Sequence, residues 1–275
     1  MAICCAALMC HAPIVVPEVG GSEAGACVRT TGAMAALADR VVAHEPDCLV
    51  LVSPHAPRER ARFGLVGDDG IHGSFARFGR RDAALGLPGA PAAARAAARH
   101  AASRGLGCVT RAGGDLDHGS MVPLWFLAAA GWRGATLVVA LPGEEDQAGS
   151  VEAAMGEALR DAAGELGERW AVVASGDMSH RLAPHAPAGF HPRAREFDRA
   201  FVAAVEAGDY RAACRPDPLL RRLAAEDVVA STRVASAAAG FARDLGAVLS
   251  YEAPFGVGYL AALLYGDGGG ALSAR

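Results

Sequence analysis

The chain has 275 residues, of which 52% are hydrophobic, and a formal net charge of −4. This length and apolar content suffice for one large domain with a buried core. The charges are dispersed and form no basic stripe, which argues against nucleic-acid binding. No apolar run approaches the roughly 20 residues that span a bilayer, and no basic segment precedes the apolar N-terminus. We therefore expect a cytoplasmic protein without membrane contact.

The cysteine and lysine content indicates the compartment and excludes two kinds of lysine-dependent site. The seven cysteines are odd in number and include no CxxC pair, which is typical of reduced thiols in a cytoplasmic protein. The chain contains no lysine, which excludes a Schiff-base lysine or a phosphate-loop lysine.

The first part of the chain predicts a β-α-β unit. An apolar run over 2–10 predicts a buried strand, helical spacing predicts a helix over 30–44, and a second strand is predicted over 48–52. This order favours two parallel strands that are neighbours in the sheet. His11 and His55 follow these strands, so we expect them to leave the same sheet edge, close together.

Strands and helices alternate through the rest of the chain. Further strands are predicted over 63–66, 108–110, 135–141, 170–174, 247–250 and 258–265. Further helices are predicted over 91–103, 123–129 (with Pro123 in the first turn), 150–166, 194–207 and 219–239. We predict one α/β domain over 1–265, with a central mostly parallel or mixed sheet flanked by helices, and a flexible glycine-rich tail over 266–275.

Other titratable side chains also follow predicted strands. His180 comes after the strand over 170–174, His118 lies in the loop after 108–110, and Glu252 follows 247–250. In open α/β sheets, ligands bind beyond the carboxyl ends of the strands. These side chains therefore predict a functional site at that edge.

His11, His55 and Glu252 suit a metal site. Two histidines and one carboxylate form the facial triad that binds non-heme Fe(II) and leaves positions open for substrate and O2. The same three residues could instead hold Zn2+ with one position open for water, as in hydrolytic zinc sites. The sequence spacing does not distinguish the two metals.

His118 and His180 are expected to act as acid/base groups beside the metal. An unperturbed histidine titrates near pH ~6.5, so small shifts let it exchange a proton near neutrality. Asp117 and Asp177 are close to them in sequence and are candidates to orient or charge an imidazole. The expected substrate contacts are Asp177, His185 and Pro123.

Five blocks of the sequence carry a family resemblance. They are His11-Ala-Pro13, Ser53-Pro-His-Ala-Pro57, Leu116-Asp-His-Gly-Ser-Met-Val-Pro-Leu124, Ser175-Gly-Asp-Met-Ser-His-Arg-Leu182 and Tyr251-Glu-Ala-Pro-Phe-Gly-Val-Gly-Tyr259. In this order they resemble the class III extradiol dioxygenase catalytic-subunit superfamily (the protocatechuate 4,5-dioxygenase beta-subunit type), which also contains the Memo-like proteins. Within it, the chain looks most similar to the dioxygenase-like domain of bacterial AmmeMemoRadiSam systems.

The resemblance implies roles for the same residues. It implies that His11, His55 and Glu252 ligate Fe(II), that His180 is the acid/base near the substrate, and that His118 assists with the bound oxygen. In such enzymes a catecholate chelates Fe(II), O2 binds beside it, and the ring opens next to the hydroxyl pair. Memo itself has a cysteine in place of the carboxylate, so Glu252 favours the dioxygenase. The resemblance also implies a homodimer.

We therefore predict an Fe(II)-dependent extradiol-type dioxygenase that opens a catechol, an aminophenol or a related small aromatic with O2. One alternative is a Memo-like metal-binding or redox protein that cleaves no ring. The other is a Zn2+-dependent hydrolase on the same ligands. The bound metal separates the hydrolase from the other two, and substrate-dependent oxygen uptake separates the enzyme from the binding protein.

Overall fold

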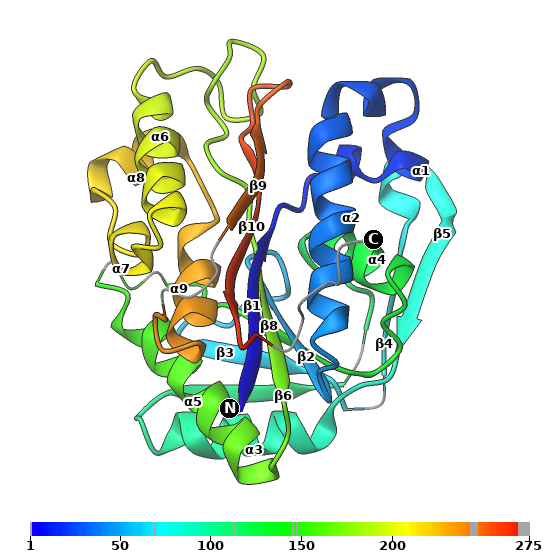
Figure 1. Cartoon of the computed structure of the whole chain (residues 1–275), viewed down its shortest axis with the longest axis vertical. Coiled ribbons are helices and arrows are strands. Elements are labelled where there is room, and N and C mark those ends of the chain that lie inside the picture. Colours follow the sequence, from blue (N-terminus) through cyan, green and yellow to red (C-terminus); the bar gives the residue numbers. More distant parts are fainter. Residues whose placement is uncertain are drawn as a thin grey trace.

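An eight-stranded mixed sheet runs through the middle of the molecule, and a two-stranded sheet stands beside it (Figure 1). The computed structural model describes residues 2–268, except 69, 113, 145, 147 and 243–246. The order across the large sheet is β6 (Gly107–Arg111), β3 (Arg62–Val66), β7 (Ala135–Ala140), β2 (Cys48–Ser53), β8 (Trp170–Ser175), β1 (Ile3–Met9), β10 (Tyr259–Gly266) and β9 (Ala247–Glu252). The small sheet pairs β4 (Ile71–Phe75) with β5 (Arg80–Leu87).

The central strands are buried on both faces, which explains why they are continuous apolar runs in the sequence. In β1, Ala6 and Leu8 pack into one hydrophobic core, whereas Ala7 and Met9 pack into the other. This alternation follows from the two-residue period of a strand. The sheet therefore separates two cores.

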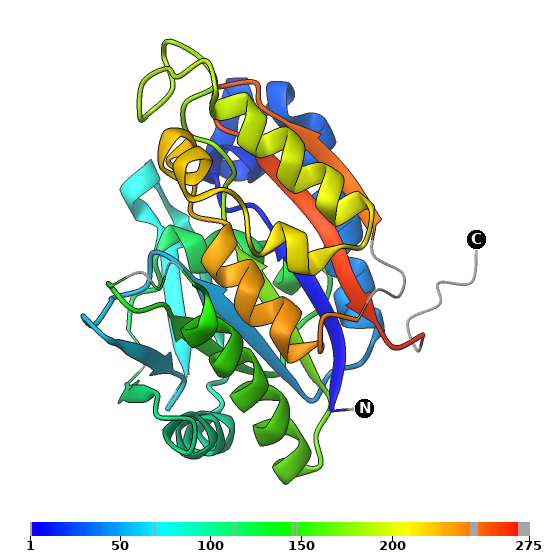
Figure 2. The same cartoon turned by 90° about the vertical axis from the view of Figure 1, so that its left-hand side faces the viewer.

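Helices cover both faces of the sheet (Figures 1 and 2). They are α1 (Pro17–Gly20), α2 (Val28–Ala43), α3 (Pro91–Ala102), α4 (His118–Ala129), α5 (Ser150–Leu166), α6 (Ala194–Glu206), α7 (Tyr210–Ala213), α8 (Pro218–Ala224) and α9 (Val229–Ala238). One core lies between the sheet and α2 with α4, and the other lies between the sheet and α3, α5, α6 and α9. The predicted α/β domain with a mixed sheet is confirmed.

The predicted pairing of the first two strands is wrong. β8 lies between β1 and β2 and is parallel to both. The chain crosses from β1 to β2 and only later fills the space between them, which a local β-α-β pattern cannot reveal. Because all three strands run the same way, their carboxyl ends still meet at one edge.

Two predicted helices have different bounds. The helix expected over 123–129 begins at His118, so Pro123 lies inside α4 rather than in its first turn. The helix expected over 219–239 is broken into α8 and α9, because Ala225 adopts the left-handed conformation (φ 54) that ends α8. The sequence predicted neither strand of the β4–β5 hairpin.

The predicted tail over 266–275 begins too early. Gly266 is the last residue of β10 and pairs with Cys5, and the Asp267 backbone N–H donates to the Cys4 carbonyl at 3.0 Å. Residues 269–275 lie outside the described residues. Among the described helices, none is long and apolar enough to cross a bilayer.

The close approach of Gly176 to α9 gives a stability prediction. A Cβ at Gly176 would lie 2.4 Å from the Val228 Cα, which is backbone and cannot rotate away. We expect Gly176→Ala to lower the free energy of unfolding by about 1–3 kcal/mol, measured by urea denaturation. In the control Gly164→Ala, within α5, the new Cβ meets nothing within 4 Å, and we expect a gain of about 0.5–1 kcal/mol. Equal stability of the two variants would contradict this packing argument.

Candidate metal centre

Two histidines meet where β1 and β2, the parallel strands on either side of β8, end. His11 lies two residues beyond β1, and His55 lies two residues beyond β2. Their ring centroids are 4.7 Å apart, and their Nε2 atoms are 3.2 Å apart. The turn after β2 is held by Ser53, whose Oγ accepts from the backbone N–H groups of His55 and Ala56. The predicted proximity of His11 and His55 is confirmed.

A third histidine joins them from the start of α4. Asp117 caps this helix by accepting from the Ser120 N–H at 3.0 Å, and the same carboxylate accepts from the Ser53 hydroxyl at 2.8 Å. These bonds join the His55 turn to the helix that begins with His118. The His118 ring stacks on the His55 ring at 4.3 Å, and the three imidazoles offer ligand nitrogens within 4.8 Å of one another. The structure thus contains a possible three-histidine metal site.

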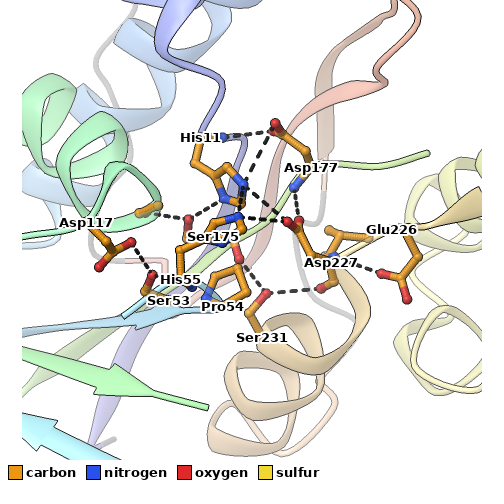
Figure 3. Close-up of polar contacts among 12 residues, drawn as sticks. His11, Ser53, Pro54, His55, Asp117, Ser175, Asp177, Glu226, Asp227 and Ser231 are labelled. Atoms are coloured by element: carbon orange, nitrogen blue, oxygen red, sulfur yellow. Dashed lines mark hydrogen bonds and ion pairs between the residues drawn. The ribbon is translucent and has the colours of Figure 1, made fainter. Parts of the chain in front are cut away.

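A carboxylate that the sequence did not single out faces the same point. Asp227 lies in the break between α8 and α9, and its Oδ2 is 3.0 Å from the His55 Nε2 and 3.4 Å from the His11 Nε2 (Figure 3). The break is stabilised by Glu226, whose Oε2 accepts from the N–H groups of Val228 and Val229 and so caps α9.

Backbone bonds orient the Asp227 carboxylate. The Asp177 N–H donates to the Asp227 Oδ1 at 2.7 Å, and the Asp227 N–H donates to the Asp177 carbonyl at 3.2 Å. This exchange leaves Oδ2 directed at the imidazoles. The Asp177 carboxylate in turn accepts from the His11 N–H at 2.9 Å. The loop after β8 therefore positions both His11 and Asp227.

The spacing of these three donor atoms fits a divalent metal ion. Ligand atoms about 2.0–2.1 Å from one ion lie about 2.9–3.4 Å apart, for angles between about 90° and the tetrahedral value. The separations among the His11 Nε2, the His55 Nε2 and the Asp227 Oδ2 are 3.0, 3.2 and 3.4 Å. Two imidazole nitrogens and one carboxylate oxygen are the donors that Fe(II) and Zn2+ accept. The residues present therefore fit such an ion.

The pKa values of the histidines differ because their neighbours differ. Burial acts to lower the pKa of His11, but Asp177 and Asp227 outweigh it and raise that pKa to about 9. Burial lowers the pKa of His118 to about 4, and the nearby imidazoles of His11 and His55 act in the same direction. Near neutral pH, His11 is therefore protonated and positively charged in the metal-free protein, whereas His118 is neutral.

A cavity of about 400 Å³ opens beside the imidazoles. His55 and His118 line it together with the aromatic rings of Phe75 and Phe78, which come from the β4–β5 hairpin. The Phe78 ring lies 6.0 Å from the His118 ring, edge to face. Arg77 and Asp115 supply charge at the cavity wall. A concave wall that mixes apolar and polar side chains in this way can hold a small molecule.

The structure places Glu252 apart from the three donor atoms. Glu252 ends β9 at the predicted sheet edge, but β10 separates it from β1, so their backbones are about 9–10 Å apart. Its Oε1 accepts from the Thr30 N–H at 2.8 Å and from the Thr30 hydroxyl at 2.6 Å. The role of Glu252 as a metal ligand stays a prediction, and its carboxylate has a different partner in this structure.

The other predicted site residues are placed at varying distances from the cluster. His180 is close enough to interact electrostatically with Asp177 and Asp227, and its buried Nδ1 has no hydrogen-bond partner. His185 is exposed on the loop after it, and Pro123 is buried inside α4. Their roles as acid/base group or substrate contacts stay predictions.

Sequence reasoning missed Asp227. The apolar spacing over 219–239 predicts one helix, in which an aspartate would be an ordinary surface residue. The pair Glu226-Asp227 ahead of an apolar run was the available signal, because acidic residues are common at helix N-termini.

Fold and site together define a class: an α/β protein with a histidine cluster at the carboxyl edge of its sheet that fits a divalent transition metal. Residues 5–262 match the family described as the catalytic LigB subunit of aromatic ring-opening dioxygenase, and the chain belongs to that family.

Known proteins that resemble the chain include one from Clostridium acetobutylicum and one from Escherichia coli. Protein CA_C1420 of Clostridium acetobutylicum is 28% identical over 262 residues, which are 92% of this chain and 55% of that protein. The chain thus spans about half the length of this relative. The crystal structure of the uncharacterized protein JW3007 from Escherichia coli K12 has a TM-score of 0.61 at 15% identity, covering 95% of this chain and 100% of that one. This second likeness shows a shared fold.

The raised pKa of His11 gives a pH prediction. A ligand nitrogen must be deprotonated to bind a metal, and the metal-free protein holds a proton on His11 below about pH 9. We expect the apparent affinity for Co2+ to rise about tenfold per pH unit between pH 6 and 8, measured by visible absorption with a competing chelator. An affinity that does not change over this range would mean that no proton is displaced from the cluster.

Proposed function

We propose that the chain binds Fe(II) through His11, His55 and Asp227 and opens the ring of a small aromatic substrate with O2. The observation that carries the proposal is the mutual spacing of 3.0–3.4 Å among the His11 Nε2, the His55 Nε2 and the Asp227 Oδ2. Membership of the ring-opening dioxygenase family supports the reaction. When bound, an ion with two histidine ligands and one carboxylate leaves neighbouring positions open for substrate and dioxygen.

The cavity walls bind and orient the substrate in this proposal. The exposed Phe78 presents its ring to a flat aromatic molecule, and the cavity of about 400 Å³ has room for a single substituted ring. His118 lines the same cavity, and its pKa of about 4 keeps it neutral at physiological pH. A neutral imidazole donates one hydrogen bond to a bound molecule without adding positive charge beside the metal.

His180 is the proposed acid/base group. Its Nδ1 is buried without a partner, so a lone pair or a proton at that atom is not committed to the protein. Its backbone N–H donates to the Ala224 carbonyl at 2.9 Å, at the end of α8, which fixes the residue beside the segment that carries Asp227. We propose that the imidazole takes the proton of a substrate hydroxyl and returns it to the product. The homodimer implied by the family resemblance remains a prediction.

A pair of isosteric variants tests the ligand assignment. We expect Asp227→Asn to weaken binding of Co2+ more than about 100-fold, because loss of a direct ligand exceeds the 10–100-fold effect of an outer hydrogen-bonding partner. We expect Glu252→Gln to change it less than about threefold, because a glutamine oxygen can still accept from Thr30. The measurement is chelator competition at one pH. The reverse result would assign Glu252 as the ligand, as the sequence predicted.

Oxygen consumption tests the reaction. Anaerobically purified, Fe(II)-loaded protein is mixed with a panel of catechols and aminophenols, and we expect rapid oxygen uptake with a yellow ring-opened product. His180→Gln is expected to keep its iron and lose about 10²–10⁴-fold in kcat, the usual contribution of a general acid or base.

The alternatives give different results in this assay. Native protein that retains zinc and hydrolyses a substrate without oxygen uptake would favour the hydrolase. Iron-loaded protein without uptake on any substrate of the panel would count against ring opening and favour a Memo-like binding or redox role.

A further inference from the structure

Pro123 occupies an unusual place in α4. The helix begins at His118, and its first ladder bond runs from the Met121 N–H to the Asp117 carbonyl at 2.8 Å. Two residues later, an N–H at position 123 would donate to the Gly119 carbonyl. Proline has no N–H, and its ring also crowds the carbonyl four residues earlier. The Gly119 carbonyl therefore receives no bond from position 123.

That carbonyl bonds to the sheet instead. The hydroxyl of Ser175, the last residue of β8, donates to the Gly119 carbonyl at 2.6 Å, deep in the interior. Gly119 is tightly enclosed, because an added Cβ would lie 2.8 Å from the Ser53 Oγ and 3.3 Å from the His55 Cδ2. The start of α4 is thereby held against both the end of β8 and the turn after β2 that carries His55.

The Ser175 bond determines which His11 nitrogen carries a proton. A serine hydroxyl has one proton, and Ser175 gives it to Gly119. The 3.0 Å contact between the Ser175 Oγ and the His11 Nδ1 must then be donated by the histidine. With its proton on Nδ1, a neutral His11 presents a bare lone pair on Nε2, the atom that faces His55 and Asp227.

We propose that Pro123 is a positioning residue for the metal centre. By withholding an N–H and crowding the Gly119 carbonyl out of the helix ladder, it directs that carbonyl to the Ser175 hydroxyl, and Ser175 in turn holds the His11 proton on Nδ1. This inference rests on the proposed role of the His11 Nε2 as a metal ligand. It gives Pro123, which is buried in α4, a role other than the substrate contact that stays a prediction.

The contacts that lead from Pro123 through Gly119 and Ser175 to His11 form a relay. This relay explains why proline, which weakens helices, lies at the sixth position of α4. An alanine at 123 would remove the ring that crowds the Gly119 carbonyl and would supply a backbone N–H, which together would draw that carbonyl into the helix ladder and away from the Ser175 hydroxyl. The freed Ser175 hydroxyl could then rotate and donate to the His11 Nδ1. The His11 proton would move to Nε2, and that nitrogen would no longer offer a lone pair to the metal. Pro123→Ala should thus strengthen the helix and weaken the metal site.

A double-mutant cycle tests the relay. Affinity for Zn2+ is measured by chelator competition for wild type, Pro123→Ala, Ser175→Ala and the double variant. We expect each single variant to bind Zn2+ about 10–100-fold more weakly, which is the range for an outer hydrogen-bonding partner. The double variant should bind no more weakly than Ser175→Ala, because Pro123 acts only through that hydroxyl. The Tm of metal-free Pro123→Ala should equal or exceed that of wild type, so the lost affinity cannot come from unfolding.

Nitrogen NMR of the Zn2+-loaded protein gives an independent reading. In wild type we expect a slowly exchanging His11 Nδ1 proton, because it is buried and bonded to Ser175. Pro123→Ala and Ser175→Ala should both lose that slow exchange. Pro91→Ala is the matched control, because Pro91 is the first residue of α3 and its missing N–H leaves no helix carbonyl unbonded. We expect Pro91→Ala to retain wild-type affinity and the same proton signal.

The outcomes separate this inference from the proposed function. Additive losses in the cycle, or an unchanged Nδ1 proton in Pro123→Ala, would overturn the relay while leaving the metal site intact. Failure of wild type to bind Zn2+ or Fe(II) would overturn both the relay and the metal site. Absence of ring opening in a metal-binding protein would overturn only the reaction, because neither affinity nor the NMR signal depends on turnover.

Discussion

β2, β8 and β1 are parallel and adjacent, and their carboxyl ends meet at one sheet edge. The end of β8 contacts both sides of the cluster: the Ser175 Oγ bonds to the His11 ring, and the Asp177 backbone exchanges bonds with Asp227. His55 reaches the cluster from β2 on the other side. Without the middle strand, the His11 ring would lose its bond to Ser175 and the Asp227 carboxylate would lose its orientation.

Charge compensation stabilises this buried edge. Burial would raise the pKa of Asp227, yet its contacts with His11 and His55 hold that pKa well below the ordinary value. Burial raises the pKa of Asp177, against the opposing effect of His11. Buried carboxylates need a neighbouring positive charge, because an uncompensated charge is costly in the interior. In the metal-free protein that cation is the His11 imidazolium, and a bound divalent ion would take its place.

Much of the fold could be predicted from local patterns. The apolar runs predicted the strands because buried strands need two apolar faces, and the helices α2 and α5 followed from their apolar spacing. His11 and His55 were correctly expected to meet. The stated reason, that their strands are neighbours, was wrong, since β8 lies between them. Glu252 was correctly placed at the same edge, yet two strands from His11.

The sequence by itself determined which residues follow each strand, because strand ends depend on nearby turn residues and apolar runs. Only the tertiary structure brought Asp227 to the histidines. The local pattern of its segment predicts a continuous helix. The break is stabilised by the Glu226 cap and by the bond from the Asp177 N–H, 50 residues earlier in the chain, to the Asp227 carboxylate. The order of the strands and the partner of the Gly119 carbonyl were likewise decided by contacts between distant segments. Such contacts leave no local periodicity, because the groups that form them are paired in space rather than along the chain.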